Sequence, residues 1–193
     1  MHLRLKLVAV LLLSASISAA PSQDVLRVRE WRAKNERQIV AELIQLVSLP
    51  NIASNKADIV KNADLLTAMF QKRGFTVRRI ETPGSPIVFA ERIAPSPRGA
   101  LTFYFHYDGQ PTEAKDWTIG QPWGPVAMHG TTRVDIATVP AIDPETRIYA
   151  RAVADDKGPI IAFLAAMDGL IASKSTLPWT LRVVLDGEEE AGS

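Results

Sequence analysis

Apolar positions along the chain follow a helical period first and a strand period afterwards. The helical spacing predicts one helix over residues 24–49, ended by Pro50, and a second over residues 57–73, with Gly74 placed as a C-terminal cap. The apolar residues that carry the two patterns are Trp31, Ile39, Leu43 and Leu46, and Ile59, Ala63, Leu66 and Phe70. Residues 76–81 and 86–92 are predicted as paired strands across a Pro-Gly turn.

The second half of the chain begins with residues 100–105, where apolar and polar side chains alternate as in a strand. Residues 109–147 are rich in Pro, Gly and Thr without clear periodicity, which predicts an irregular surface loop. Residues 160–171 are apolar on all sides and predict a buried helix. Residues 179–185 predict a core strand covered on both faces.

Alternating helices and strands favour an α/β fold with a mixed central β-sheet flanked by helices. Polar residues 187–193 follow the core strand directly, at a point where an α/β protein would normally continue. The sheet is therefore expected to be incomplete.

The first twenty residues have the layout of a secretory signal peptide. Arg4 and Lys6 precede an apolar stretch over residues 7–13, and the small residues 18–20 follow it. This stretch is shorter than the ~20 residues that a bilayer span needs, so no stable membrane anchor is expected. We predict a signal peptide over residues 1–20, a folded portion over residues 21–193, and a periplasmic or secreted product.

Composition restricts the chemistry that the chain can perform. The 22 Lys and Arg residues nearly balance the 21 Asp and Glu residues, so nucleic acid is not an expected partner. There is no cysteine, which excludes thiol nucleophiles, disulfides and cysteine-ligated metals. Any metal would be held by Asp, Glu and the two histidines beyond the leader, His106 and His129.

A first candidate site lies at the end of the strand that begins at residue 100. Residues two apart on a strand point the same way, so His106 and Asp108 are presented together. In a metal site, His106 would bind the ion and Asp108 would accept the other ring N–H. The alternative is that Asp108 caps the turn that follows the strand.

A second candidate is the Asp155-Asp156 pair directly before the buried helix. Two adjacent carboxylates repel each other, and a helix N-terminus offsets only ~0.3–1 kcal/mol of that cost. A divalent cation would offset more, and one carboxylate can bridge two ions. The alternative is an acidic first turn of a helix.

A third candidate is the run Glu188-Glu189-Glu190 after the core strand, where open α/β sheets place their sites. One glutamate would bind a metal while its neighbour acts as general base on water. A solvated acidic loop is the alternative. From residue 155 to residue 190 there are seven carboxylates and three basic side chains, an imbalance that a dication relieves.

Together the three candidates resemble the M20 family of metallopeptidases, nearest to its carnosinase-like and PepV-like dipeptidase branch. The resemblance rests on three motifs with their flanking residues: His106-Tyr107-Asp108-Gly109-Gln110-Pro111, Ala154-Asp155-Asp156-Lys157-Gly158-Pro159 and Gly187-Glu188-Glu189-Glu190-Ala191-Gly192-Ser193. It implies a mixed-sheet catalytic domain with two metal ions, usually zinc, and an inserted lid domain that mediates dimerisation. Residues 21–193 would be the N-terminal portion of that catalytic domain, without the lid.

The resemblance also implies a role for each motif residue. His106 would bind one metal, Asp108 would orient His106, and Asp155 would bridge both metals. The Asp155–Asp156 peptide bond would be cis. Glu189 would be the general base and Glu190 a metal ligand, which leaves Glu188 without a role.

The implied reaction is attack of metal-activated water on an amide bond of a dipeptide or an N-acyl amino acid. Zinc, manganese and cobalt all accept such ligands. The family's Gly-Arg-Gly before the Asp-Asp pair is Ala150-Arg151-Ala152 here, and the loop over residues 128–146 is longer than expected. The remaining ligands and the substrate-binding groups are expected beyond Ser193, and His129 matches no motif.

Two other interpretations of the sequence stay open. In one, the 193 residues are a truncated, inactive product that binds at most one metal ion. In the other, they form a periplasmic binding module whose acidic pocket takes cationic ligands.

Overall fold

The computed structural model describes residues 20–192. The predicted signal peptide lies outside these residues except for Ala20. Within the described part, no helix has both the length and the apolar character needed to cross a membrane.

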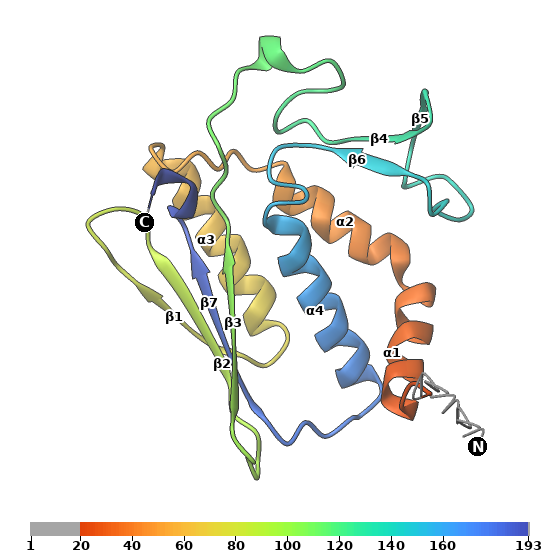
Figure 1. Cartoon of the computed structure of the whole chain (residues 1–193), viewed down its shortest axis with the longest axis vertical. Coiled ribbons are helices and arrows are strands. Elements are labelled where there is room, and N and C mark those ends of the chain that lie inside the picture. Colours follow the sequence, from red (N-terminus) through yellow and green to blue (C-terminus); the bar gives the residue numbers. More distant parts are fainter. Residues whose placement is uncertain (1–19, 193) are drawn as a thin grey trace, which may run out of the picture.

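A four-stranded mixed sheet with strand order β1-β2-β7-β3 forms the centre of the fold (Figure 1). The strands β1 (Thr76–Ile80), β2 (Ile87–Arg92) and β7 (Thr180–Asp186) are antiparallel neighbours. Strand β3 (Ala100–His106) runs parallel to β7, and His106 pairs with Asp186 in the register. The parallel pairing brings the carboxyl ends of two strands far apart in sequence side by side. It also confirms the predicted mixed α/β fold.

Four helices lie beside this sheet: α1 (Gln23–Lys34), α2 (Glu36–Val47), α3 (Lys56–Gln71) and α4 (Lys157–Ala172). Helices α3 and α4 pack against the strands, and α1 and α2 pack on α4. The single helix predicted over residues 24–49 is wrong, because the helix breaks at Asn35. That residue has φ −116°, and its side-chain Nδ2 donates to the carbonyl of Trp31. Helix α3 is followed by Gly74 at φ +77°, as its capping role requires.

The described helices lie to one side of the sheet, where the hydrophobic core forms (Figure 1). Phe163 of α4 packs on Phe103 and Phe105 of β3, with ring centroids 4.9 and 5.8 Å apart. Alternate residues of β3 and β7 point the other way, and Tyr104 and Arg182 are exposed there. Within residues 20–192, β7 is therefore covered on one face, not on the two that its low polarity predicted.

A second, three-stranded sheet forms within part of the segment that was predicted to be irregular, and most of the rest of that segment is irregular. Its strands β4 (Val126–His129), β5 (Thr132–Val134) and β6 (Arg147–Tyr149) are antiparallel in the order β5-β4-β6. A short 3₁₀ helix, η1 (Ala114–Asp116), precedes them. Strands of three or four residues are too short to produce a readable alternation, so the prediction of a loop was wrong here.

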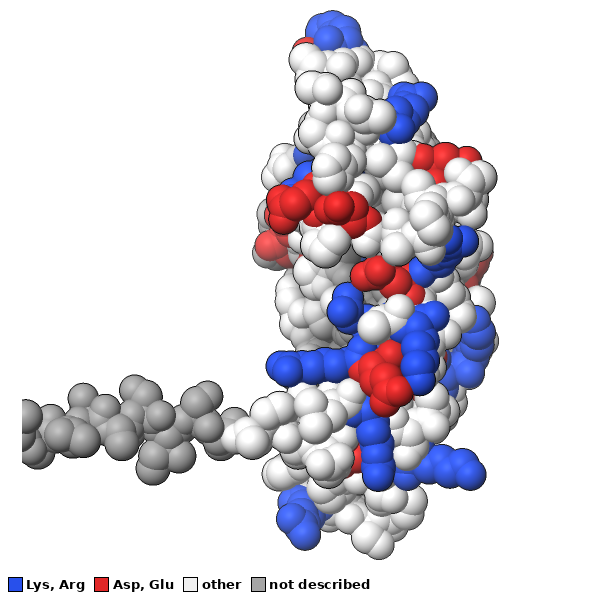
Figure 2. Space-filling view, turned by 90° about the vertical axis from the view of Figure 1, so that its right-hand side faces the viewer, with Lys and Arg blue, Asp and Glu red and all other residues white. Residues whose placement is uncertain are grey.

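On the face seen in Figure 2, which is the right-hand side of the view in Figure 1, basic side chains predominate in the lower half, with acidic side chains among them and above them.

Candidate metal centre

The three acidic motifs meet at one end of the central sheet. The register of β3 and β7 places His106 beside Asp186, and the glutamate run begins at Glu188, two residues after Asp186. Helix α4 begins at the same, upper end in Figure 1, so the Asp155-Asp156 pair before it lies there too. The fold thus assembles the site from chain segments that are distant in the sequence.

Ligand atoms of His106, Glu189 and Glu190 lie within 4.8 Å of one another. His106 is buried, Glu190 is half-buried and Glu189 is exposed. An imidazole and carboxylates are ligands that zinc and related divalent ions accept, so this donor set fits such an ion. The structure brings together three of the five site residues predicted from the sequence in one cluster.

His106 lies between two carboxylates. Its Nε2 is 2.8 Å from Oδ1 of Asp155, and its Nδ1 is 3.3 Å from Oδ1 of Asp108. The Asp108 carboxylate, and to a smaller extent that of Asp155, raises the pKa of His106 to about 9 against the opposing effect of burial. Asp155 thus contacts the cluster through His106 without belonging to it, and its side chain is 77% exposed.

Asp108 does more than the sequence indicated. Besides facing His106, its fully buried carboxylate accepts the backbone N–H of Glu189 at 3.2 Å and that of Glu190 at 3.0 Å. One carboxylate therefore fixes both the imidazole and the backbone of the glutamate run. The spacing His-x-Asp carries no signal for this second contact, which arises only when β3 and β7 pair.

Two further residues hold the site and were not found from the sequence. Buried Asn51 donates through Nδ2 to the Tyr107 carbonyl at 2.9 Å, and its own carbonyl accepts the N–H of Gly109. Gln110 donates through Nε2 to Oε2 of Glu190 at 2.5 Å. The two Asn51 hydrogen bonds hold the residues on either side of Asp108. The Gln110 hydrogen bond restricts the Glu190 carboxylate.

The Asp155–Asp156 peptide bond is cis, in agreement with the family pattern. Oδ2 of Asp156 accepts the backbone N–H of His106 at 3.3 Å. Lys157 is fully buried and donates through Nζ to the carbonyls of Leu46 and Leu49. Burial lowers the pKa of Lys157 to about 7. These contacts attach the motif to β3 on one side and to the end of α2 on the other.

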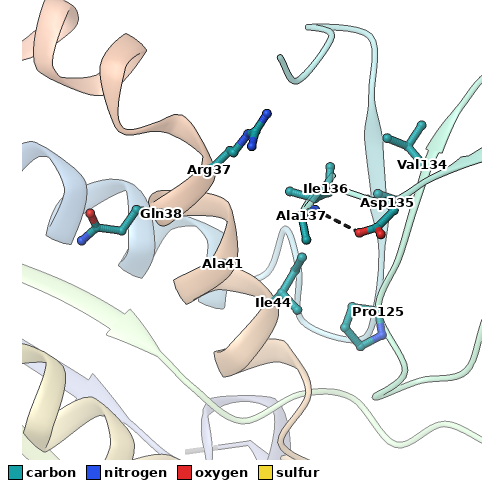
Figure 3. Close-up of a pocket in the computed structure, with 10 residues that line it drawn as sticks. Arg37, Gln38, Ala41, Ile44, Pro125, Val134, Asp135, Ile136 and Ala137 are labelled. Carbon is teal, nitrogen blue, oxygen red and sulfur yellow. Dashed lines mark hydrogen bonds between the residues drawn. The ribbon is translucent and has the colours of Figure 1, made fainter. Parts of the chain in front are cut away.

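A groove of ≈ 660 Å³ lies away from this cluster, between α2 and the second sheet (Figure 3). Its one acidic side chain is Asp135, which accepts the N–H of Ala137. Ile44, Pro125 and Ile136 supply apolar surface. His129 lies on β4 and faces Asp143, with Nδ1 3.5 Å from Oδ1. Neither feature contains the donor set of the acidic motifs.

The model of peptidase family M20/M25/M40 matches residues 102–193, the segment that supplies all three motifs. Over this segment the chain is similar to that family. It is 28% identical over 111 residues to human Beta-Ala-His dipeptidase, covering 58% of this chain and 19% of that protein. It is 24% identical over 173 residues to the Cys-Gly metallodipeptidase dug1 of Schizosaccharomyces pombe, covering 83% and 33%.

The fold agrees with this similarity. The M20 family metallo-carboxypeptidase Sso-CP2 from Sulfolobus solfataricus superimposes with a TM-score of 0.64 at 30% identity. The alignment covers 80% of this chain and 32% of that one. The chain thus spans a third or less of the length of these relatives.

Proposed function

We propose that this chain is the N-terminal part of an M20 metallopeptidase that hydrolyses an amide bond in a dipeptide or an N-acyl amino acid. The observation that carries the proposal is the cluster of His106, Glu189 and Glu190, whose glutamate backbone is fixed by buried Asp108. The dipeptidases among the relatives favour a small peptide substrate.

We assign the binding of divalent metal to His106, Glu190 and Asp155, which would hold the ions. Zinc suits the mixed nitrogen and oxygen donors, and manganese or cobalt would also be accepted. Because the pKa of His106 is about 9 without metal, binding below that pH displaces a proton from its ring. We also propose that further residues of the whole protein complete the set of metal ligands, and that a lid domain pairs two copies of the protein.

The reaction divides between the ions and the side chains. Divalent ions held by these residues would supply a lowered pKa for bound water and polarisation of the scissile carbonyl. Glu189 takes the proton of the attacking water at a carboxylate oxygen and passes it to the departing amine. Asp108 keeps Glu189 in place through its backbone and holds the His106 ring in one orientation.

Removal of metal is expected to abolish hydrolysis reversibly. The purified native gene product is assayed with a panel of dipeptides and N-acyl amino acids before and after treatment with a chelator. We expect hydrolysis to fall to background and to return when zinc, manganese or cobalt is added back. Hydrolysis that persists without metal would contradict the proposal, as would a metal-loaded protein that cleaves none of these amides.

We also propose that the protein is exported and that residues 1–20 are removed. The basic start, apolar stretch and small residues over these positions support this. Mass spectrometry of the protein from its source cells is expected to find an N-terminus near residues 20–21 in the exported fraction. A cell-internal product that retains Met1 would contradict export.

A further inference from the structure

Glu188 is the one glutamate of the run to which the family pattern assigns no task. Its carboxylate turns to the β1–β2 turn, residues 82–86, where Oε2 accepts the backbone N–H of Ser85 at 2.8 Å. Its own backbone N–H donates to Oδ1 of Asp186 at 3.0 Å. The side chain therefore links the glutamate run to a turn that lies far earlier in the chain.

The turn and the glutamate run are packed closely against each other at two glycines, Gly84 and Gly187. A Cβ atom at Gly84 would overlap the Glu188 carboxylate, so the absence of a side chain at Gly84 is what admits that carboxylate. A Cβ atom at Gly187 would stand 2.5 Å from the Tyr107 hydroxyl and 2.9 Å from Cβ of Ser85. Buried Tyr107 in turn donates from its hydroxyl to the carbonyl of Pro86.

The turn is itself held in place. Oγ1 of Thr82 donates to the carbonyl of Ser85 at 2.7 Å, which closes the turn internally. Lys56, the first residue of α3, donates through Nζ to the carbonyl of Pro83 at 2.9 Å. Ser85 and Pro86 are buried. Glu188 is thus attached to a part of the fold that is fixed independently of the metal centre.

We propose that Glu188 is a positioning residue, and that the β1–β2 turn braces Glu189 and Glu190 through it. Asp108 holds the backbone of these two glutamates from the end of β3, and the N–H of Ser85 in the β1–β2 turn holds Glu188, the residue before them. The three glutamates are thereby held by contacts with two different segments, at the point where the chain leaves β7 and enters a short 3₁₀ helix, Glu189–Ala191. We call this contact between Glu188 and Ser85 the brace. Its expected effect on metal binding and turnover rests on the proposed function, whereas its effect on the backbone of the glutamate run does not.

Three substitutions separate the brace from other roles. Glu188→Ala removes the acceptor for the Ser85 N–H, and Glu188→Gln keeps an acceptor oxygen while removing the charge. Gly84→Ala leaves Glu188 in the chain but places a methyl group where its carboxylate lies. Because the overlapping atoms are the end of a flexible side chain, that carboxylate has to leave while the fold remains. Glu113→Ala, at an exposed ion pair, and Gly124→Ala, in an exposed turn, are the matched controls.

The first measurement is hydrogen–deuterium exchange of the peptide spanning residues 186–192 in the native, metal-free protein. We expect faster exchange in Glu188→Ala and Gly84→Ala, and exchange close to wild type in Glu188→Gln and both controls. The second is the dissociation constant for zinc, which we expect to rise about 10- to 100-fold in the first two variants. The double variant should lose no more than the more affected single variant, because both substitutions remove one contact.

The brace is overturned if Glu188→Ala exchanges like wild type, or if the losses of the two single variants multiply in the double variant. Loss of the Glu188→Gln rescue would overturn a positioning role in favour of a role for the charge. The exchange measurement needs neither metal nor substrate. A wild-type protein that hydrolyses no peptide would therefore refute the proposed function, while the exchange rates would still decide whether the brace exists.

Discussion

Replacing Glu189 by glutamine is expected to lower kcat by about 10²- to 10⁴-fold, the usual contribution of a general base. The amide of glutamine has nearly the same shape but takes up no proton from water. The backbone N–H of residue 189 still donates to Asp108, so the geometry of the site is expected to survive. Steady-state kinetics of the variant and the wild-type protein, both loaded with metal, measure the loss.

Metal content decides between two roles for Glu189, because its carboxylate also lies within the metal-binding cluster. If Glu189 is the base, the glutamine variant keeps the metal content of wild type, as does a Glu145→Gln control at an exposed ion pair. A variant that turns over at the wild-type rate would remove Glu189 from the chemistry. A variant that loses its metal would make Glu189 a ligand instead.

Replacing Arg73 by methionine is expected to lower the free energy of unfolding by about 3–5 kcal/mol, the cost of breaking a buried ion pair. The Arg73 side chain is 2% exposed, and it pairs with Asp168 of α4 and Glu42 of α2. It also donates from Nη1 to the carbonyl of Met69. Without the guanidinium, the half-buried carboxylate of Asp168 would lose its cation, and Glu42 would keep only its pair with the exposed Lys72.

Urea unfolding of the purified protein measures this difference, with Arg79→Met as the control. Arg79 is more exposed and pairs with Asp64 on the surface, so its loss should cost less than about 1 kcal/mol. Equal unfolding curves for the two variants would show that the ion pairs of Arg73 with α2 and α4 add no stability beyond that of a surface pair.

Much of the architecture was predictable because its signals are local. The stripe from Ile59 to Phe70 belongs to α3, and the alternation that ends at His106 belongs to β3. The apolar run over residues 160–171 lies within α4, which begins slightly earlier, at Lys157. Each of these elements buries enough apolar side chains to leave its period in the sequence.

The features that were missed depend on contacts between distant residues or on very short elements. The break at Asn35 interrupts a helical pattern that continues on both sides of it, so periodicity hides it. The strands β4 to β6 are too short for a period. The contacts of Asp108 with the glutamate run and of Lys157 with α2 join segments whose proximity appears only after folding. Their residue types alone carry no such information.

The most direct test of the metal centre is an anomalous-diffraction map of the protein crystallised with zinc. We expect a peak within bonding distance of His106 and Glu190, with Asp155 turned to the same ion and Asp108 on the far side of the imidazole. A map with no peak at His106, or with zinc only at a surface pair such as His129 and Asp143, would contradict the assignment of the site.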